Sequence, residues 1–494
     1  MQEENSIKKI LPYLSIFLII EILSYFSLSF LFLNQVIFIV LAIYCLIISF
    51  YRLEYGLLLV LGELLIGSMG HLFVLSVGDF QLSIRMVFWL IIMLVFSLKF
   101  IKQLFNVGKN SNYLISLKNF SYLKYVVILF VFVVISLLNA YFRGHNLNLI
   151  FSDANSWLYW FLILPLVVVY SKNDKKLFVN LKVLFIAACL WISLKTLALL
   201  FVFTHNLDMA PNIYTWLRKT LVGEMTPTLS GWPRIFIQGQ IFSGLALFLT
   251  FWSSLKIKKK EYLKVFTNIC LATIFASSLL ISFSRSFWVG LIVAIIFSFV
   301  TAWRIFSWKK ALNTLVWFFG SFVFGFIVIY LVAIFPYPTP GKFNADFINR
   351  ISNGGESAVS SRWSLLPILG KEIMKEPFFG QGYGATATYI SSDPRVLEKN
   401  PSGEYTTYAF EWGFFDLWLK LGLFGLFTYL LLLYNLLKNS ITFAYQDKNF
   451  LLFGLASGIV FLIATNFFTP YLNHPLGIGI LLFGACLIQK DRVY

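Results

Sequence analysis

Apolar runs of about 20 residues recur along the whole of this chain, and they constrain its fold more than any other feature. A run of that length crosses a hydrocarbon core of roughly 30 Å as an α-helix. Because lipid offers no hydrogen-bond partners, a chain that meets it must satisfy its backbone groups internally. The composition agrees, since 59% of the 494 residues are hydrophobic and only 12% are charged. The sequence therefore predicts an all-α polytopic membrane protein.

The apolar runs predict about fourteen membrane spans, within a range of twelve to fourteen. The expected spans lie near residues 10–31, 34–51, 56–76, 83–100, 125–142, 156–171, 180–203, 235–254, 264–283, 286–303, 312–335, 414–437, 450–468 and 475–489.

Lysines gather in alternate loops between these spans. Examples are Lys8 with Lys9, the four lysines of residues 256–260, and Lys309 with Lys310. By the positive-inside rule this side is the cytoplasm, and we expect both termini there. The net charge of +17 is then mostly a topology signal, and we expect no nucleic-acid partner.

The loops on the other side divide the chain into four segments. We expect N-terminal helices and a middle outer loop over 1–234, helices over 235–335, one large extracytoplasmic loop over 336–413, and C-terminal helices over 414–494. The large loop has balanced charges, and apolar spacing typical of a helix covers residues 361–376. This pattern predicts a folded cap with a helix lying on the membrane surface.

Three arginines are expected on the outer side, at or near helix ends. Arg285 lies in ISFSRSFWVGL (281–291), between two apolar runs, where a charge costs roughly 2.5–3.5 kcal/mol unless it has a partner or a task. Arg234 precedes the span near 235–254, and Arg362 opens the helical part of the large loop. A guanidinium binds phosphate through two parallel hydrogen bonds, so these residues are candidates for a lipid diphosphate site. The alternative is that they extend to lipid headgroups. Arg85 is a further candidate for this cluster.

Glu411 begins the segment EWGFFDLWLKLGLFGL (411–426), where the large loop returns to the membrane. Partial desolvation there would raise its pKa from about 4.3 and make it a candidate base. The alternative is that Glu411 caps a helix N-terminus, where negative charge is favourable. Asp416 and Lys420 are four residues apart and predict an ion pair on one helical face.

Other polar features predict structure rather than chemistry. Three glycines in PFFGQGYGATA (377–387) predict a tight turn under the cap, since no strand precedes them and no phosphate-binding lysine follows. Glu21, Glu63 and Lys195 lie within apolar runs, and we expect them in internal ion pairs or in polar contacts between helices. The four cysteines predict small core residues, and the four histidines have no metal-ligand spacing. We expect no metal and no cofactor.

Three segments, taken in order, resemble the bacterial O-antigen ligase and O-antigen polymerase superfamily. SFSRSFWVGL resembles its Ser-Arg-Ser turn, SRWSLLPILGKEIMKEPFFGQGYGA resembles its Arg-Trp segment and following glycine turn, and LKLGLFGL resembles its Gly-x-x-Gly helix start. The resemblance covers residues 235–437. The ligases usually have twelve spans and place a His-Asn pair eleven residues before the first glycine of the closing segment. Here that position is Glu411, which favours a polymerase-like or diverged member.

The resemblance implies a metal-independent, inverting glycosyltransferase in the bacterial cytoplasmic (inner) membrane, with its active site on the periplasmic side. The implied partners are an undecaprenyl-diphosphate-linked glycan donor and an acceptor that is a glycan, a lipid or a protein. Glu411 would act as the base, and Arg234, Arg285 and Arg362 would bind the diphosphate, with Arg285 also assisting catalysis. The alternative is a transporter or flippase of lipid-linked oligosaccharide.

Overall fold

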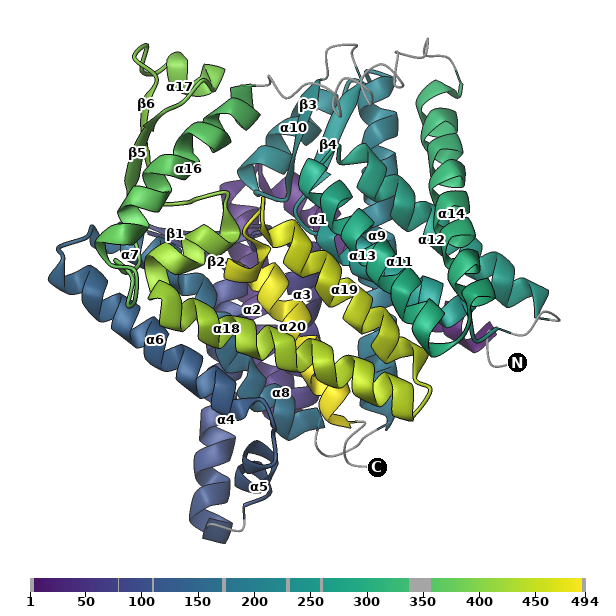
Figure 1. Ribbon diagram of the computed structural model, residues 1–494, viewed down its shortest axis with the longest axis horizontal. Coiled ribbons are helices and arrows are strands. Elements are labelled where there is room, and N and C mark those ends of the chain that lie inside the picture. Colours follow the sequence, from purple (N-terminus) through teal and green to yellow (C-terminus); the bar gives the residue numbers. More distant parts are fainter. Residues whose placement is uncertain are drawn as a thin grey trace.

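The computed structural model describes residues 4–78, 80–108, 111–170, 175–227, 232–257, 261–336 and 357–490 (Figure 1). Helices make up most of this part of the chain. Residues 337–356 of the predicted large loop and Lys258, Lys259 and Lys260 lie outside the described residues.

Within the described residues, ten helical segments are long and apolar enough to cross a membrane. They are α1 (Glu4–Ser27), α2 (Leu31–Tyr51), α4 (Ile84–Val107), α6 (Leu123–Phe142), the continuous α7 (Leu147–Ala154), η2 (Asn155–Leu162) and α8 (Ile163–Tyr170), α9 (Lys175–Thr204), α12 (Tyr262–Ile281), α13 (Arg285–Ile305), α14 (Trp308–Ile334) and α18 (Gly413–Gln446). Four shorter apolar helices accompany them, α3 (Leu53–Ile66), α11 (Gln240–Ser254), α19 (Phe450–Asn466) and α20 (Pro475–Lys490). The predicted polytopic helical protein is confirmed, while the number of crossings and the position of the termini stay predictions.

The described part of the chain contains five further helical segments between these helices. They are α5 (Asn112–Lys118), α10 (Ala210–Lys219), α16 (Ser357–Lys375), α17 (Pro394–Leu397) and η3 (Tyr471–Asn473).

In the part of the chain that the structure describes, three antiparallel hairpins interrupt the helical pattern that the sequence predicts. They are β1 (Val74–Val77) with β2 (Phe80–Ser83), β3 (Gly223–Pro227) with β4 (Pro233–Ile237), and β5 (Ala387–Ile390) with β6 (Glu404–Thr407). The expected spans 56–76 and 235–254 are therefore too long at one end, because β1 and β4 occupy those residues. A short apolar run fits a buried strand as well as a helix, which explains the error.

Two ion pairs lie inside the bundle. Lys195 Nζ lies 2.5 Å from Glu21 Oε1, and Arg85 Nε lies 2.8 Å from Glu63 Oε2. Each of these four side chains is at most 7% exposed. The expected ion pairs between helices are thus confirmed, and pairing removes the cost of isolated charges in this setting.

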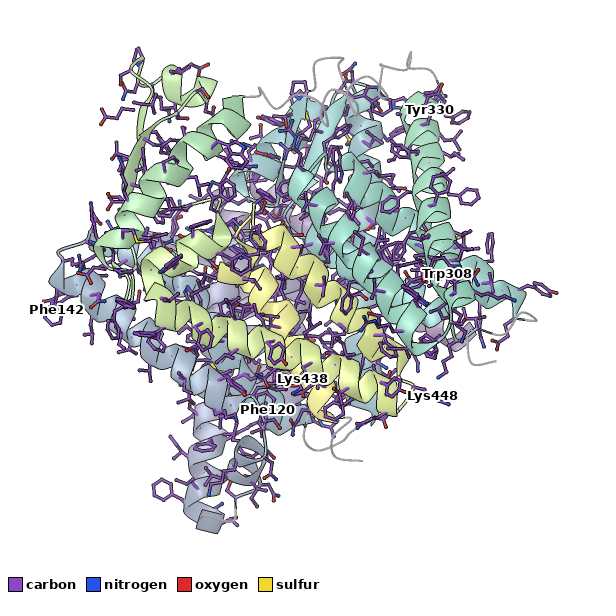
Figure 2. All side chains as sticks on the ribbon, viewed as in Figure 1. Phe120, Phe142, Trp308, Tyr330, Lys438 and Lys448 are labelled. Atoms are coloured by element: carbon purple, nitrogen blue, oxygen red, sulfur yellow. The ribbon has the colours of Figure 1, made fainter. Side chains whose placement is uncertain are left out.

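The described part of the large loop folds as α16, α17 and the β5–β6 hairpin, which stand together at one end of the bundle (Figure 1). We call these elements the cap, and the end of the bundle that carries them and the β3–β4 hairpin the cap end. The predicted helix over 361–376 is confirmed as α16. Lys438 and Lys448 lie away from the cap end (Figure 2). This position agrees with the prediction that the lysine-rich loops and the large loop lie on opposite sides of the membrane.

The glycine turn of residues 377–384 packs against a kink in α18. Gly380, Gly382 and Gly384 have positive φ angles of 74°, 95° and 73°, which confirms the predicted tight turn. The kink is at Gly422, whose φ of 72° and ψ of 176° are not helical. The N–H of Gln381 donates to the carbonyl of Leu419 at 2.7 Å, and that of Leu423 donates to Pro377 at 2.8 Å. The kink divides α18 into two helical parts, and the Gly-x-x-Gly segment lies where the second part begins, as the resemblance implies.

This packing leaves no room for a side chain at Gly422. A Cβ there would lie 2.2 Å from the carbonyl oxygen of Phe378, and the positive φ disfavours any L-residue. We expect Gly422→Ala to lower the free energy of unfolding by at least about 2 kcal/mol and to increase proteolysis of the cap. Thermal unfolding and limited proteolysis of the purified protein in detergent would measure both effects.

Gly370→Ala is the matched control, because a Cβ at this position in α16 meets nothing within 4 Å. It should be neutral or stabilising, since alanine is favoured over glycine within a helix by about 1 kcal/mol. Equal unfolding midpoints for the two variants would contradict the packing described here.

Candidate active site

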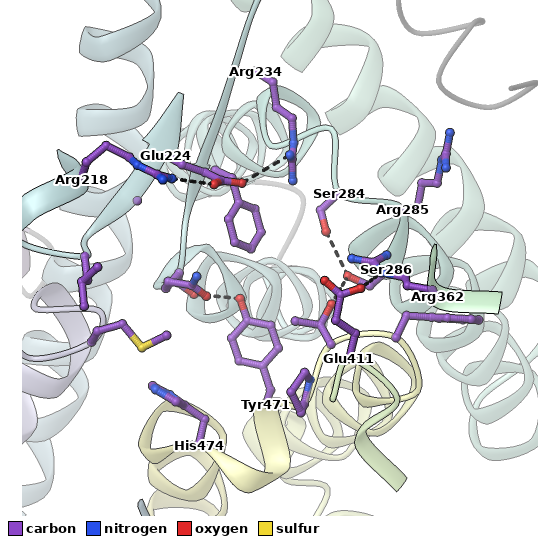
Figure 3. Close-up of a pocket in the computed structure, with 18 residues that line it drawn as sticks. Arg218, Glu224, Arg234, Ser284, Arg285, Ser286, Arg362, Glu411, Tyr471 and His474 are labelled. Atoms are coloured by element: carbon purple, nitrogen blue, oxygen red, sulfur yellow. Dashed lines mark hydrogen bonds and ion pairs between the residues drawn. The ribbon is translucent and has the colours of Figure 1, made fainter. Parts of the chain in front are cut away.

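A cavity of about 550 Å³ at the cap end brings together all four residues singled out from the sequence. Arg234, Arg285, Arg362 and Glu411 line it, although they come from four separate elements (Figure 3). In the view of Figure 3, Arg285 lies at the opposite end of the cavity from His474.

The Ser-Arg-Ser turn places Arg285 at the first residue of α13. α12 ends at Ile281, and the chain reverses within three residues before α13 begins. Phe283 has a φ of 48°, an uncommon conformation for a bulky residue, and its side chain is only 1% exposed. The buried phenyl ring therefore anchors the turn, and the short reversal predicted from the sequence is confirmed.

The hydroxyls beside Arg285 form a chain of hydrogen bonds. Ser284 Oγ and Ser286 Oγ are 2.9 Å apart, and Thr469 Oγ1 donates to Ser286 Oγ at 2.9 Å. This chain fixes the turn against the segment that follows α19. It also places polar groups at the positive N-terminus of α13, where a helix favours an anion.

Arg234 lies on β4 and is held in place by three contacts. Its Nε donates to the carbonyl of Ser282 at 3.0 Å, so the strand is tied directly to the Ser-Arg-Ser turn. Its NH1 lies 3.4 Å from Glu224 Oε1 on the paired strand β3, and its guanidinium stacks over Phe236. Glu224 also pairs with Arg218 at 3.1 Å. The hairpin therefore presents a pre-oriented guanidinium to the cavity.

Glu411 forms an ion pair with Arg362, which lies in the second turn of α16 rather than at its start. The side chain of Glu411 is 52% exposed, so the desolvation expected from the sequence is limited. The helix cap is Trp412, which makes no capping hydrogen bond through its side chain. Trp412 Nε1 instead donates to the carbonyl of Arg362 at 2.9 Å. Two contacts thus join the start of α18 to the cap helix at this point.

The charge of the cavity lining favours an anionic ligand. Four arginines and two glutamates line it, so two positive charges remain after pairing. The N-terminus of α13 adds a partial positive charge. A lining of this kind suits a phosphate or diphosphate, for which arginine provides paired hydrogen bonds.

His474 lines the same cavity but is a poor candidate for a base. Burial and the nearby Arg85 charge lower its pKa from 6.5 to about 3. Its Nδ1 accepts a hydrogen bond of 3.4 Å from the N–H of Leu476 at the start of α20. The imidazole therefore stays neutral at neutral pH. The sequence analysis does not identify His474 or Glu224 as site residues. Glu224 reaches the cavity through strand pairing and His474 lies beside the start of α20, both outside the segments that resemble the family.

The predicted pair of Asp416 and Lys420 is confirmed at 2.6 Å, but it belongs to a larger network. Asp153, 267 residues earlier in the chain, also contacts Lys420 at 2.7 Å.

Arg85 does not join the arginine cluster, because Glu63 binds it inside the bundle. Within the described residues, no group of three His, Cys, Asp or Glu side chains is placed to hold a metal ion.

Residues 270–430 match the family model described as O-antigen ligase. The match includes Arg285, Arg362 and Glu411, and it confirms the resemblance to the O-antigen ligase and polymerase superfamily over this segment. Arg234 lies outside the matched residues. No curated protein matches the chain. An O-antigen ligase-like function is thereby supported.

The lowered pKa of His474 predicts how stability depends on pH. Below about pH 6.5 the unfolded chain gains a proton on this imidazole that the folded protein does not, so the free energy of unfolding falls as the pH drops toward 3. His474→Gln removes this dependence. Between pH 7 and pH 5 the wild type should lose roughly 1–2 kcal/mol more than the variant. Unfolding midpoints at both pH values would measure it, and parallel curves would show that His474 is not buried in its neutral form.

Proposed function

We propose that the chain is a membrane glycosyltransferase that transfers or polymerises a glycan from an undecaprenyl-diphosphate-linked donor onto an acceptor hydroxyl. The observation that carries the proposal is that Arg234, Arg285, Arg362 and Glu411 all line one cavity at the cap end. The O-antigen ligase match over 270–430 supports the same class of reaction.

The arginines bind the diphosphate of the donor. Arg234 and Arg285 both line the cavity, and their elements are linked because Arg234 Nε donates to the carbonyl of Ser282 in the turn before α13. Negative charge develops on the departing diphosphate during transfer, and fixed cations stabilise it more than they stabilise the bound donor. The hydroxyls of Ser284 and Ser286 add neutral hydrogen-bond donors at the same site.

Glu411 acts as the general base. The acceptor O–H bond breaks as its proton moves to the Glu411 carboxylate, and the acceptor oxygen forms a bond to the anomeric carbon. The bond between that carbon and the phosphate oxygen breaks at the same time, and the diphosphate leaves with the electron pair. Attack opposite the leaving group inverts the anomeric configuration. The diphosphate linkage supplies the driving force, so the proposal includes no nucleotide, metal or other cofactor.

Arg362 positions the base. Its ion pair orients the Glu411 carboxylate, and the partial exposure of both side chains leaves the carboxylate accessible to a substrate hydroxyl. Because Arg362 belongs to α16, the position of the cap controls the position of the base.

The proposal places the cap end at the outer face of the cytoplasmic membrane and the lysine-rich loops in the cytoplasm. A transporter of lipid-linked oligosaccharide would instead need a polar site near the bilayer midplane. The charged residues within the bundle, such as Glu21 with Lys195, are neutralised in pairs, and the candidate cations lie at the cap end. These positions favour the transferase over the transporter.

Complementation in a host that lacks the protein tests the proposal. We expect Arg285→Ala and Glu411→Gln each to reduce transfer by roughly 100-fold or more, because each removes a group that acts in the transition state. The readout is the length ladder of surface glycan on a gel, with protein level confirmed by blot. Shortened or absent ladders at normal protein level are the expected result.

Two matched controls lie on the same elements. Arg304→Ala removes an exposed arginine from the last turn of α13, the helix that Arg285 begins. Glu404→Gln changes an exposed carboxylate of β6 in the cap. Both should leave the ladder unchanged. Wild-type ladders for Arg285→Ala and Glu411→Gln would overturn the proposed roles.

A further inference from the structure

A second cavity, of about 590 Å³, adjoins the first at the cap end. Met69, Leu221, Pro470 and His474 line both cavities, so these four residues form their common boundary. The mechanism above does not use this second cavity.

The second cavity differs from the first in charge. Its charged lining consists of two bases and two acids, Arg85, Lys420, Asp153 and Asp416. Glu63, which does not line the cavity, pairs with Arg85. Asp153 and Asp416 both contact Lys420, at 2.7 Å and 2.6 Å. A balanced lining gives no preference for an anion, so this cavity suits a neutral polar ligand.

The other lining groups match the chemistry of a sugar. Five aromatic residues line the cavity, Trp89, Phe151, Tyr159, Tyr408 and Phe410. Aromatic rings pack against the apolar faces of ligands, while carboxylate and amide groups bind hydroxyls. The hydroxyl of Tyr159 and Oδ1 of Asn473 have no hydrogen-bond partner among the described residues, although both are buried. Such groups normally find a partner, and a polyhydroxylated ligand offers many.

The position of the second cavity relates it to the proposed base. Phe410 lines the second cavity, and the next residue, Glu411, lines the first. Glu411 therefore follows directly, along the chain, a residue that lines the second cavity. In-line displacement needs the attacking hydroxyl and the leaving diphosphate on opposite sides of the anomeric carbon, and two adjoining cavities provide separate places for them.

We propose that the second cavity binds the acceptor, and that the acceptor is a neutral glycan end rather than an anionic group. This proposal rests on the proposed transferase function, because it assigns the second substrate of the same reaction. The balanced charge, the aromatic lining and the boundary at Phe410 and Glu411 carry it.

Two binding probes on the purified protein in detergent test the assignment. One is undecaprenyl diphosphate without sugar, and the other is a neutral oligosaccharide released from the host's own surface glycan. We expect Tyr408→Ala to weaken oligosaccharide binding at least about fivefold and to leave undecaprenyl diphosphate binding within about twofold, because one aromatic contact is lost from one cavity only. Arg234→Ala should show the reverse pattern. Isothermal titration calorimetry would measure both.

Two further variants provide a second test of the acceptor site and a control. Gln81→Ala removes an exposed side chain that lines the second cavity and should also weaken the oligosaccharide alone. Tyr405→Ala changes a nearby cap tyrosine outside both linings and should alter neither affinity. Unchanged oligosaccharide binding in Tyr408→Ala and Gln81→Ala would overturn the acceptor site. Unchanged undecaprenyl diphosphate binding in Arg234→Ala would instead overturn the donor site of the proposed function.

Discussion

The backbone contact between the glycine turn of the cap and the kink in α18 is the constraint on which the site depends. Backbone hydrogen bonds from Gln381 to Leu419 and from Leu423 to Pro377 join the two segments, and the indole N–H of Trp418 on α18 also donates to the carbonyl of Pro377. A second set of contacts, in which Leu365, Leu369 and Ile373 of α16 pack near Trp412 and Leu419, fixes the cap helix to α18. Arg362 and Glu411 lie at this junction. A shift of the cap would therefore move the proposed base and its partner together, and would alter the cavity that they share with the arginines.

Two kinds of charge arrangement occur within one helical bundle. Inside it, Glu21 with Lys195 and Glu63 with Arg85 are closed pairs that satisfy each other. At the cap end, arginines outnumber glutamates around an open cavity. Closed pairs suit structural support in an apolar setting, whereas a surplus of cations beside a helix N-terminus suits an anionic ligand. This difference in pairing explains why Arg85 has a structural role, whereas we propose a functional role for Arg285.

Much of the fold followed from the sequence, and the reasons for the exceptions are physical. Membrane-length helices, the short turn at Arg285 and the pair of Asp416 with Lys420 follow from hydropathy and helical spacing. The β3–β4 hairpin was missed, since an apolar run of five residues does not distinguish a strand from a helix. Without the hairpin, the contact between Glu224 and Arg234 could not be predicted, because strand pairing brings these two residues together.

Some residues of the candidate site could be predicted from the sequence and others could not. Arg234, Arg285, Arg362 and Glu411 were found from residue type, position near span ends and resemblance, and the structure places all four in one cavity. Asp153 and His474 could not be found, because each reaches its cavity through long-range packing that leaves no local pattern in the sequence. The cap leaves the side chain of Glu411 half exposed, which agrees with the partial desolvation expected from the sequence.

A cryo-electron microscopy structure of the protein in a lipid nanodisc with undecaprenyl diphosphate bound would locate the donor site directly. We expect density for both phosphates in the cavity at the cap end, within hydrogen-bond distance of the Arg234 and Arg285 guanidinium groups. Phosphates located near the bilayer midplane, or at the lysine-rich end of the bundle, would contradict it and favour a transporter.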